Sequence, residues 1–202
     1  MVSKMFKGGL LHIRGKKASI GIRLFLRKKL TCIGAFIYPL EENLAIILES
    51  GIDVNFYRKL VEEIFRKFNI RLRIAISCEE TISKVLDKAY YNLRSIEMEN
   101  IVYDVHECEV EELASLFIPN YTSLSISFSK YMNIVFETFK LINRYEGIII
   151  PYENGSYIGF IPREGINEIA SFRKYLGVGV HVKPGIAVGN AISDFKGASH
   201  ES

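Results

Sequence analysis

The chain has 202 residues, of which 49% are hydrophobic and 24% are charged, an ordinary composition for a folded protein. Its longest apolar run is far shorter than the roughly 18 to 20 residues that a membrane span needs, and its first residues lack the apolar segment of a signal peptide. We therefore expect a cytoplasmic protein that does not enter a membrane. Cys32, Cys78 and Cys108 show no CxxC spacing, which argues against a disulfide framework and a structural zinc site, so we expect reduced thiols.

The charge of the chain is distributed unevenly. Its net charge is only +3, but residues 1–40 contain nine Lys and Arg residues and no acidic residue. Such a basic arm attracts phosphate on a nucleotide, an RNA or an anionic lipid, because Lys and Arg raise the local concentration of anions. The alternative is a solvated basic face without a partner. RNA is thus a candidate partner through this N-terminal arm.

The first half of the chain begins with a segment of ambiguous periodicity. Residues 18–33 alternate as in a strand, but their apolar residues also recur at three and four residue steps, and we favour a helix. The elements expected around it are a strand over 9–14, a hairpin of 35–38 with 44–48, a helix over 55–68, a strand over 72–76 and a helix over 79–96. A polar joint follows at 97–100.

The second half repeats this order with a shorter ending. The expected elements are a strand over 101–108, a loop through 119–121, a helix over 125–144, a hairpin of 147–152 with 156–161, a short helix over 167–175 and a strand over 181–188. Asn154-Gly155 marks the turn of this hairpin, since Asn-Gly favours tight hairpin turns. Almost no closing helix is expected, and the tail after Lys196 looks frayed or non-native.

The repeated order predicts the fold class. Each copy reads strand, helix, hairpin, helix, strand, helix, which indicates an α+β protein of two repeated ferredoxin-like or palm-type units, with antiparallel sheets and helices on one face. We place the first palm-like repeat at residues 1–98 and the second, with a truncated closing helix, at 99–202. Because both hairpins carry Glu-Asn at their tips, the functional residues are expected there and on the adjacent strands.

Carboxylates near the second hairpin predict a metal site. Asp104 lies in the expected opening strand of the second copy and Glu153 at the hairpin tip, and these two strands should be neighbours. Hard oxygen ligands from two adjacent elements can hold Mg²⁺ while it bridges substrate phosphates. Strand alternation puts His106 on the same face as Asp104, where it could act as a third ligand or proton carrier. Alternatively, Glu153 only flanks a polar turn and Asp104 pairs locally.

Several segments together carry a family resemblance. Tyr103-Asp104, the long helix over 131–147, the closing Gly185-Ile-Ala-Val-Gly189 and the duplicated unit resemble archaeal GTP cyclohydrolase III. The resemblance spans most of the chain and is specific in its second half. That family consists of two cyclase-like palm domains and uses magnesium to open the guanine ring of GTP and release pyrophosphate. Its Gly-Gly-Asp-Asn hairpin is replaced here by Tyr152-Glu153-Asn154-Gly155.

The resemblance implies a magnesium-dependent hydrolase, and a homo-oligomer, that acts on GTP or another purine nucleoside triphosphate. Asp104 and Glu153 would hold the Mg²⁺, and His106 would move protons to or from the attacking water. Asn154, and Asn43 at the matching tip of the first copy, would bind the substrate. The altered hairpin leaves an alternative open, a catalytically degenerate relative that binds a nucleotide, an RNA or a partner protein without turnover.

Overall fold

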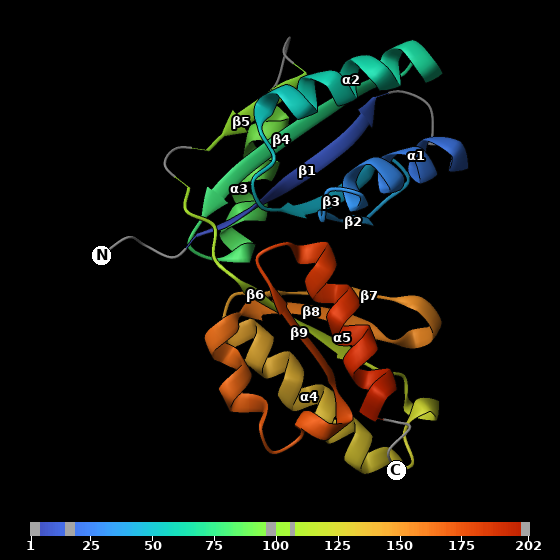
Figure 1. The fold of residues 1–202 in the computed structure, drawn as a ribbon, viewed down its shortest axis with the longest axis vertical. Coiled ribbons are helices and arrows are strands. Elements are labelled where there is room, and N and C mark those ends of the chain that lie inside the picture. The colour runs from blue at the N-terminus through green and yellow to red at the C-terminus, as the bar shows by residue number, and fades with distance from the viewer. Residues whose placement is uncertain (1–4, 15–18, 96–99, 106–107, 199–202) are drawn as a thin grey trace. The chain divides into compact units, whose positions relative to one another are not determined.

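The computed structural model describes residues 5–14, 19–95, 100–105 and 108–198, which form an α+β protein with two sheets. The chain divides into two compact units, Met1–Glu111 and Glu112–Ser202, each with its own sheet and helices (Figure 1). We expected this division after residue 98. It lies later in the chain because the strand over 101–104 joins the sheet of the first unit. No helix in the described part of the chain has the length and hydropathy to cross a bilayer.

The first unit contains a five-stranded sheet with the order β2-β3-β1-β4-β5. Its elements are β1 (Phe6–Arg14), α1 (Ile20–Thr31), β2 (Phe36–Pro39), β3 (Leu44–Glu49), α2 (Val54–Phe68), β4 (Arg71–Glu79), α3 (Ile82–Ser95) and β5 (Ile101–Asp104). Strands β4 and β5 are parallel, and the other neighbouring strands are antiparallel.

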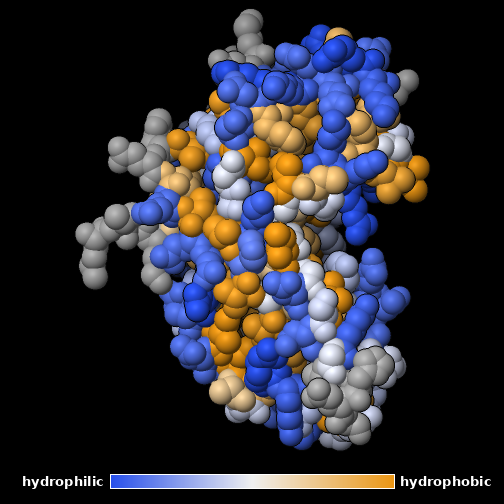
Figure 2. Space-filling model, in the orientation of Figure 1, coloured by the Kyte–Doolittle hydropathy of each residue, from blue (hydrophilic) through white to orange (hydrophobic). Residues whose placement is uncertain are grey.

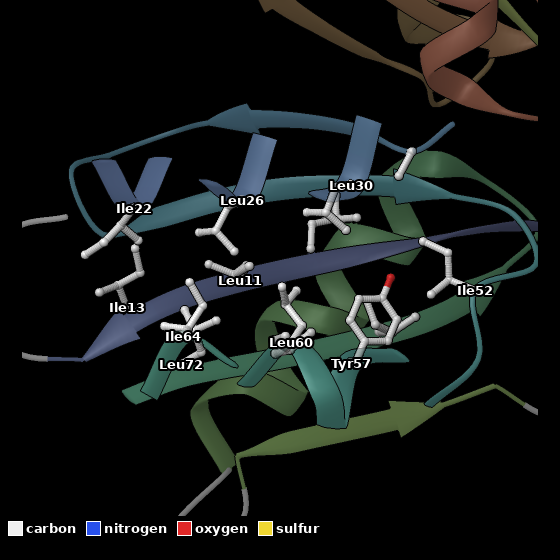
Figure 3. Packing of buried hydrophobic residues seen from close by; sticks show 14 residues of the cluster. Leu11, Ile13, Ile22, Leu26, Leu30, Ile52, Tyr57, Leu60, Ile64 and Leu72 are labelled. Atoms are coloured by element: carbon white, nitrogen blue, oxygen red, sulfur yellow. The ribbon is translucent and has the colours of Figure 1, made fainter. Parts of the chain in front are cut away.

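Helix α1 packs on the first sheet through one apolar stripe. Ile22, Leu26 and Leu30 point toward Leu11 and Ile13 of β1 in the core shown in Figure 3. Their four-residue spacing places them on one side of a helix. The helix favoured for this ambiguous segment is therefore confirmed.

Helix α2 packs on the same face of the sheet and begins at an Asp53 cap. The Asp53 carboxylate accepts a hydrogen bond from the Phe56 amide at 2.9 Å, and the helix ends at Asn69 in the left-handed conformation, with φ 53°. The surface over α2 is largely hydrophilic in Figure 2, as expected for an amphipathic helix with its apolar side in the core.

Helix α3 covers the opposite face of the first sheet. The Ser77 hydroxyl of β4 donates to the carbonyl of Val85 on α3 at 2.6 Å, whereas the adjacent Ile76 lies in the α1 and α2 core. Because successive strand residues face opposite sides, these two residues point into different layers. Helices α1 and α2 share one face, as predicted, and α3 adds a layer on the other.

The second unit contains a four-stranded antiparallel sheet with the order β7-β8-β6-β9. Its strands and α-helices are β6 (Leu113–Ile118), α4 (Phe128–Arg144), β7 (Ile148–Pro151), β8 (Tyr157–Pro162), β9 (Gly177–His181) and α5 (Pro184–Ala198). Short 3-10 helices occupy Tyr121–Ser123, Glu153–Gly155, Arg163–Ile169 and Arg173–Tyr175. Helix α4 packs with Leu116 on one face, and the ring of Phe195 on α5 lies 5.4 Å from that of Phe117 on the other.

The two units share one plan. The order of elements in the second unit, β6, α4, β7, β8, β9, α5, matches β1, α1, β2, β3, β4, α3 of the first. The four strands that the two sheets have in common are arranged in the same way, as β2-β3-β1-β4 and β7-β8-β6-β9. Both hairpin tips are closed by equivalent bonds, from Leu40 N to Leu44 O at 2.9 Å and from Tyr152 N to Ser156 O at 2.8 Å. The tips are therefore in register, as the repeat predicts.

The expected opening strand of the second copy is wrong. Residues 101–104 form β5, which pairs in parallel with β4 of the first unit, and the second sheet opens with β6 in a segment expected as a loop. The β6 sequence is a nearly continuous apolar run because helices cover both of its faces. Such a run lacks the alternation that identifies a half-buried strand.

The expected ending of the second copy is also wrong. Its last strand is β9, and the segment expected as a strand over 181–188 runs largely into α5, which supplies the closing helix. A Cβ atom at Gly177 would lie 1.9 Å from the carbonyl oxygen of Ala191, and one at Gly179 would lie 2.1 Å from that of Ala187. These glycines allow the helix backbone to approach the strand closely.

Two of the three cysteines form a disulfide, contrary to the expected reduced thiols. Cys78 of β4 is bonded to Cys108, with their Cα atoms 6.1 Å apart, and Cys32 is free and exposed. A bond between residues 30 positions apart leaves no spacing signal in the sequence. It fastens the segment after β5 to the first sheet.

A buried ion pair joins β1 to β3 and β5. Lys7 Nζ lies 3.1 Å from Glu49 Oε1 and donates to the Ile52 carbonyl and the Tyr103 hydroxyl, both at 2.6 Å. Lys7 is 6% and Glu49 1% exposed. Burial raises the pKa of Glu49, and the Lys7 charge is the main opposing influence. Lys7 is therefore a structural cation and not part of the basic surface expected for the N-terminal arm.

We predict that Cys78→Ser lowers the free energy of unfolding by about 3 to 4 kcal/mol, because the loop closed by the disulfide no longer restricts the unfolded chain. The parent protein, denatured without reductant, should show one reactive thiol in a thiol titration and three after reduction. Cys32→Ser is the control and should leave stability nearly unchanged. Three thiols before reduction would contradict the disulfide.

We predict that Lys7→Met and Glu49→Leu each cost about 3 to 5 kcal/mol, because each leaves one buried charge alone, whereas the double variant costs much less than their sum. In Lys7→Met the folded pKa of Glu49 rises further. The native state then binds a proton more tightly than the unfolded state, so stability falls as the pH rises between the ordinary and the folded pKa. Urea unfolding across pH measures both effects, and additive losses would disprove the coupling.

Candidate functional site

The two carboxylates predicted to share a metal belong to different sheets. Asp104 ends β5 in the first sheet, and Glu153 lies at the tip of the β7 and β8 hairpin in the second. The expectation that their strands are neighbours is therefore wrong. A shared metal site remains a prediction that would require both units.

Asp104 interacts with helix α3. Its Oδ2 atom lies 3.1 Å from Lys88 Nζ and accepts a hydrogen bond from Asn92 Nδ2 at 3.4 Å. Lys88 Nζ also lies 2.8 Å from Glu79 Oε1, and the hydrogen bond to Glu79 is the largest cause that raises the pKa of Lys88. The lysine thus bridges two carboxylates and attaches β5 to α3, which is the local pairing weighed as the alternative for Asp104.

The second hairpin tip is a tight polar turn. Glu153–Gly155 forms one 3-10 turn, in which Asn154 has a left-handed φ of 55°, and both Glu153 and Asn154 are exposed. The Ser156 hydroxyl donates to the Glu153 carbonyl at 2.5 Å. The tip therefore presents one carboxylate and one amide to solvent.

Asn120 holds this tip and was not among the residues singled out from the sequence. Its Nδ2 donates to the Asn154 carbonyl at 2.6 Å, and its Oδ1 accepts from Thr122 Oγ1 at 2.9 Å and from Ser123 N at 3.0 Å. An Asn that lies soon after a strand and two or three residues before Thr and Ser is a typical capping signal. Its position became interpretable only once β6 was known to end at Ile118.

Within the second unit, the described residues at the tip include one of the two predicted magnesium ligands, Glu153. Strand β6 carries no Asp or Glu, and the side chain that reaches the tip from its end is the Asn120 amide. Within the described ranges, no group of three or more His, Cys, Asp or Glu side chains is placed to hold a metal. Glu153 alone is fewer than the two carboxylates that the hypothesis requires.

Three other residues were predicted to belong to the site, namely Asn43, Asn154 and His106. Asn43 lies at the first hairpin tip, where its carbonyl accepts from Ile13 N at 2.8 Å. The corresponding chain position beside the second tip is that of Asn120. The first tip is therefore held by the last residues of β1, and the second by the residues just after β6. The substrate roles of Asn43 and Asn154 remain predictions. His106 lies outside the described residues.

Comparison with known proteins gives a distant structural similarity. No family model and no curated protein matches the chain. Two solved structures of a bacterial light-regulated adenylyl cyclase are similar to it. One is 12% identical, covers 94% of this chain and 82% of its own, and has a TM-score of 0.28. The other is 12% identical, covers 86% and 72%, and has a TM-score of 0.24.

We predict that Asn120→Asp lowers the free energy of unfolding at neutral pH by about 1 to 3 kcal/mol, because a carboxylate oxygen then faces the Asn154 carbonyl. This contact raises the folded pKa of the new carboxyl. Relative to the parent, stability should therefore be lost as the pH rises above the ordinary Asp value of about 3.9. Thr122→Val, which removes another bond to Asn120, is the control and should show no such dependence. Equal parent and Asn120→Asp unfolding curves would refute this role.

Proposed function

We propose that the protein binds a phosphate-bearing purine ligand, a nucleotide or an RNA, without the magnesium-dependent ring opening implied by the resemblance. One observation carries the proposal. At the second hairpin tip, the side chain that contacts the turn from the end of the neighbouring strand β6 is the Asn120 amide and not a carboxylate. Metal-assisted phosphate chemistry needs a cation held between reactive oxygens, and an amide with one carboxylate is a weak site for it.

The distribution of basic residues supports phosphate binding. Lys7 and Lys29 are paired with Glu49 and Glu63, at 3.1 and 2.8 Å, so they contribute little to an anion site. Arg27 and Lys28 on α1 are exposed and form no ion pair with a described residue. The basic N-terminal region therefore keeps part of its charge available to a phosphate ligand.

The enzymatic alternative requires two structural conditions that binding alone does not. Asp104 and Glu153 would have to share a metal although they lie in different sheets, and Asp104 would have to leave its ion pair with Lys88. Binding without turnover requires neither event. We therefore place the catalytically degenerate function ahead of the hydrolase.

We predict that the protein, incubated with GTP and millimolar Mg²⁺, releases no pyrophosphate and leaves the ultraviolet spectrum of GTP unchanged. Equilibrium dialysis with GTP and fluorescence anisotropy with a labelled oligoadenylate should show binding of at least one ligand that weakens as salt is raised. The two probes distinguish a nucleotide ligand from an RNA.

Pyrophosphate release by the parent that Asp104→Asn and Glu153→Gln both abolish would establish the hydrolase instead. Glu137→Gln, a change on an exposed face of α4, is the control for these two variants and should have no effect on either measurement. The absence of binding to both probes would refute the proposal.

A further inference from the structure

Four basic or titratable side chains lie together on one face of the first sheet. His12 and Arg14 of β1 are directly opposite Arg73 and Arg71 of β4 in the antiparallel register. The residues between them, Ile13 and Leu72, lie in the α1 and α2 core. Because strand residues alternate, the four others face the side on which α3 packs, where Arg14 and Arg71 are exposed and His12 and Arg73 are partly buried. We call these four residues the arginine face.

The register of the arginine face brings the Cβ atoms of its four residues close together. Residues opposite each other on antiparallel strands have Cβ atoms about 4.5 to 5.5 Å apart, and residues two positions apart along a strand are separated by about 6.7 Å. Three guanidinium groups anchored at such spacings carry like charges on neighbouring positions, which repel one another. This repulsion destabilises the arrangement when no anion is bound. The same spacing allows the arginines to bind more than one anionic group at a time.

The arginines lack partners in the described part of the chain. Arg14, Arg71 and Arg73 form no side-chain hydrogen bond or ion pair with a described residue, and Arg73 Nε is buried without an acceptor. Buried polar groups in native proteins are nearly always paired, so such a donor needs an explanation. An anionic ligand whose oxygen atoms accept the hydrogen bond would explain this donor.

The pKa of His12 is lowered by burial and by the positive charges at this face. Burial lowers its pKa, Arg73 and Arg14 lower it further, and Glu41 at the hairpin tip has the smallest influence, in the opposite direction. Glu41 therefore opposes the two arginines without cancelling their effect on the pKa of His12. The local charge remains positive.

The second unit lacks the arginine face. Leu10 is opposite Ile46 and Ala75, as Phe117 is opposite Ile158 and Gly177, which aligns the two sheets. In this alignment the positions of the four side chains are occupied by Pro119, Tyr121, Tyr175 and Arg173. Arg173 is paired with Asp194 at 2.8 Å. The unpaired positive face is therefore specific to the first copy and is not a by-product of the repeated fold.

We propose that the arginine face binds the phosphodiester backbone of single-stranded RNA. This inference rests on the proposed function and gives it a location. Guanidinium groups form paired hydrogen bonds with phosphate oxygens, and a flat row of them on two strands suits successive phosphates of one strand. Tyr38 of β2 is opposite Ile46 of β3 and faces the same side of the sheet, where a partly buried ring can stack on a base.

The test compares two triple variants with the same change in net charge. The first replaces Arg14, Arg71 and Arg73 by Gln, and the control replaces Arg58, Lys59 and Arg66 of α2, a helix on the other face of the sheet, by Gln. Anisotropy with labelled oligoadenylate should show at least a tenfold loss of affinity in the first variant and less than a twofold change in the control. The slope of log affinity against log salt should decrease in magnitude by about 2 for three lost phosphate contacts.

The outcomes separate this inference from the proposed function. If the parent binds oligoadenylate and both triple variants bind it equally well, the location is wrong and the proposed function stands. If the parent binds neither RNA nor GTP, both fail. Preference for GTP, or for vesicles containing phosphatidylserine, over oligoadenylate would overturn the RNA assignment. The double variant Arg14→Gln/Arg71→Gln, which changes only exposed side chains, repeats the test if the triple variant does not fold.

Discussion

The register of β1 against β4 is the constraint on which the first unit depends. Leu11 and Ile13 of β1 and Leu72 and Ile74 of β4 all face the α1 and α2 core. A shift by one residue would turn this apolar set to the other side, so the burial of one face fixes the pairing. The same pairing sets His12 opposite Arg73 on the other face. Core packing thus determines which charged residues meet, although none of them contributes to the core.

The sequence predicted the elements whose pattern is local. The α2 helix and both hairpins are encoded within a few residues each, and each was found close to its expected position. Elements defined by distant partners were missed. Strand β6 is apolar on both sides because α4 and α5 cover it, and Gly177 marks a helix that arrives from later in the chain. Neither cause is visible within the segment itself.

The error in the candidate site has the same origin. Asp104 was paired with Glu153 because residues 101–108 were assigned to the second sheet, and moving that strand to the first sheet removes the neighbour relation. The Glu-Asn tip was located correctly, since its turn is local. Asn120 was missed because its role depends on where β6 ends. The arginine face was missed because it joins two segments about 60 residues apart in the sequence, through a register that single-sequence patterns do not provide.

The two copies have kept one framework and diverged in the chemistry at equivalent ends of their sheets. Both hairpin tips are closed by an equivalent backbone bond. The first tip also accepts a hydrogen bond from the end of β1, and the second accepts one from the residues just after β6. Beside the first tip lie His12 and Arg14, and beside the second lie Pro119, Tyr121 and the Asn120 amide. The framework tolerates these differences because such side chains lie outside both cores. A repeated fold can therefore carry different polar side chains at equivalent positions of its two copies without a change in topology.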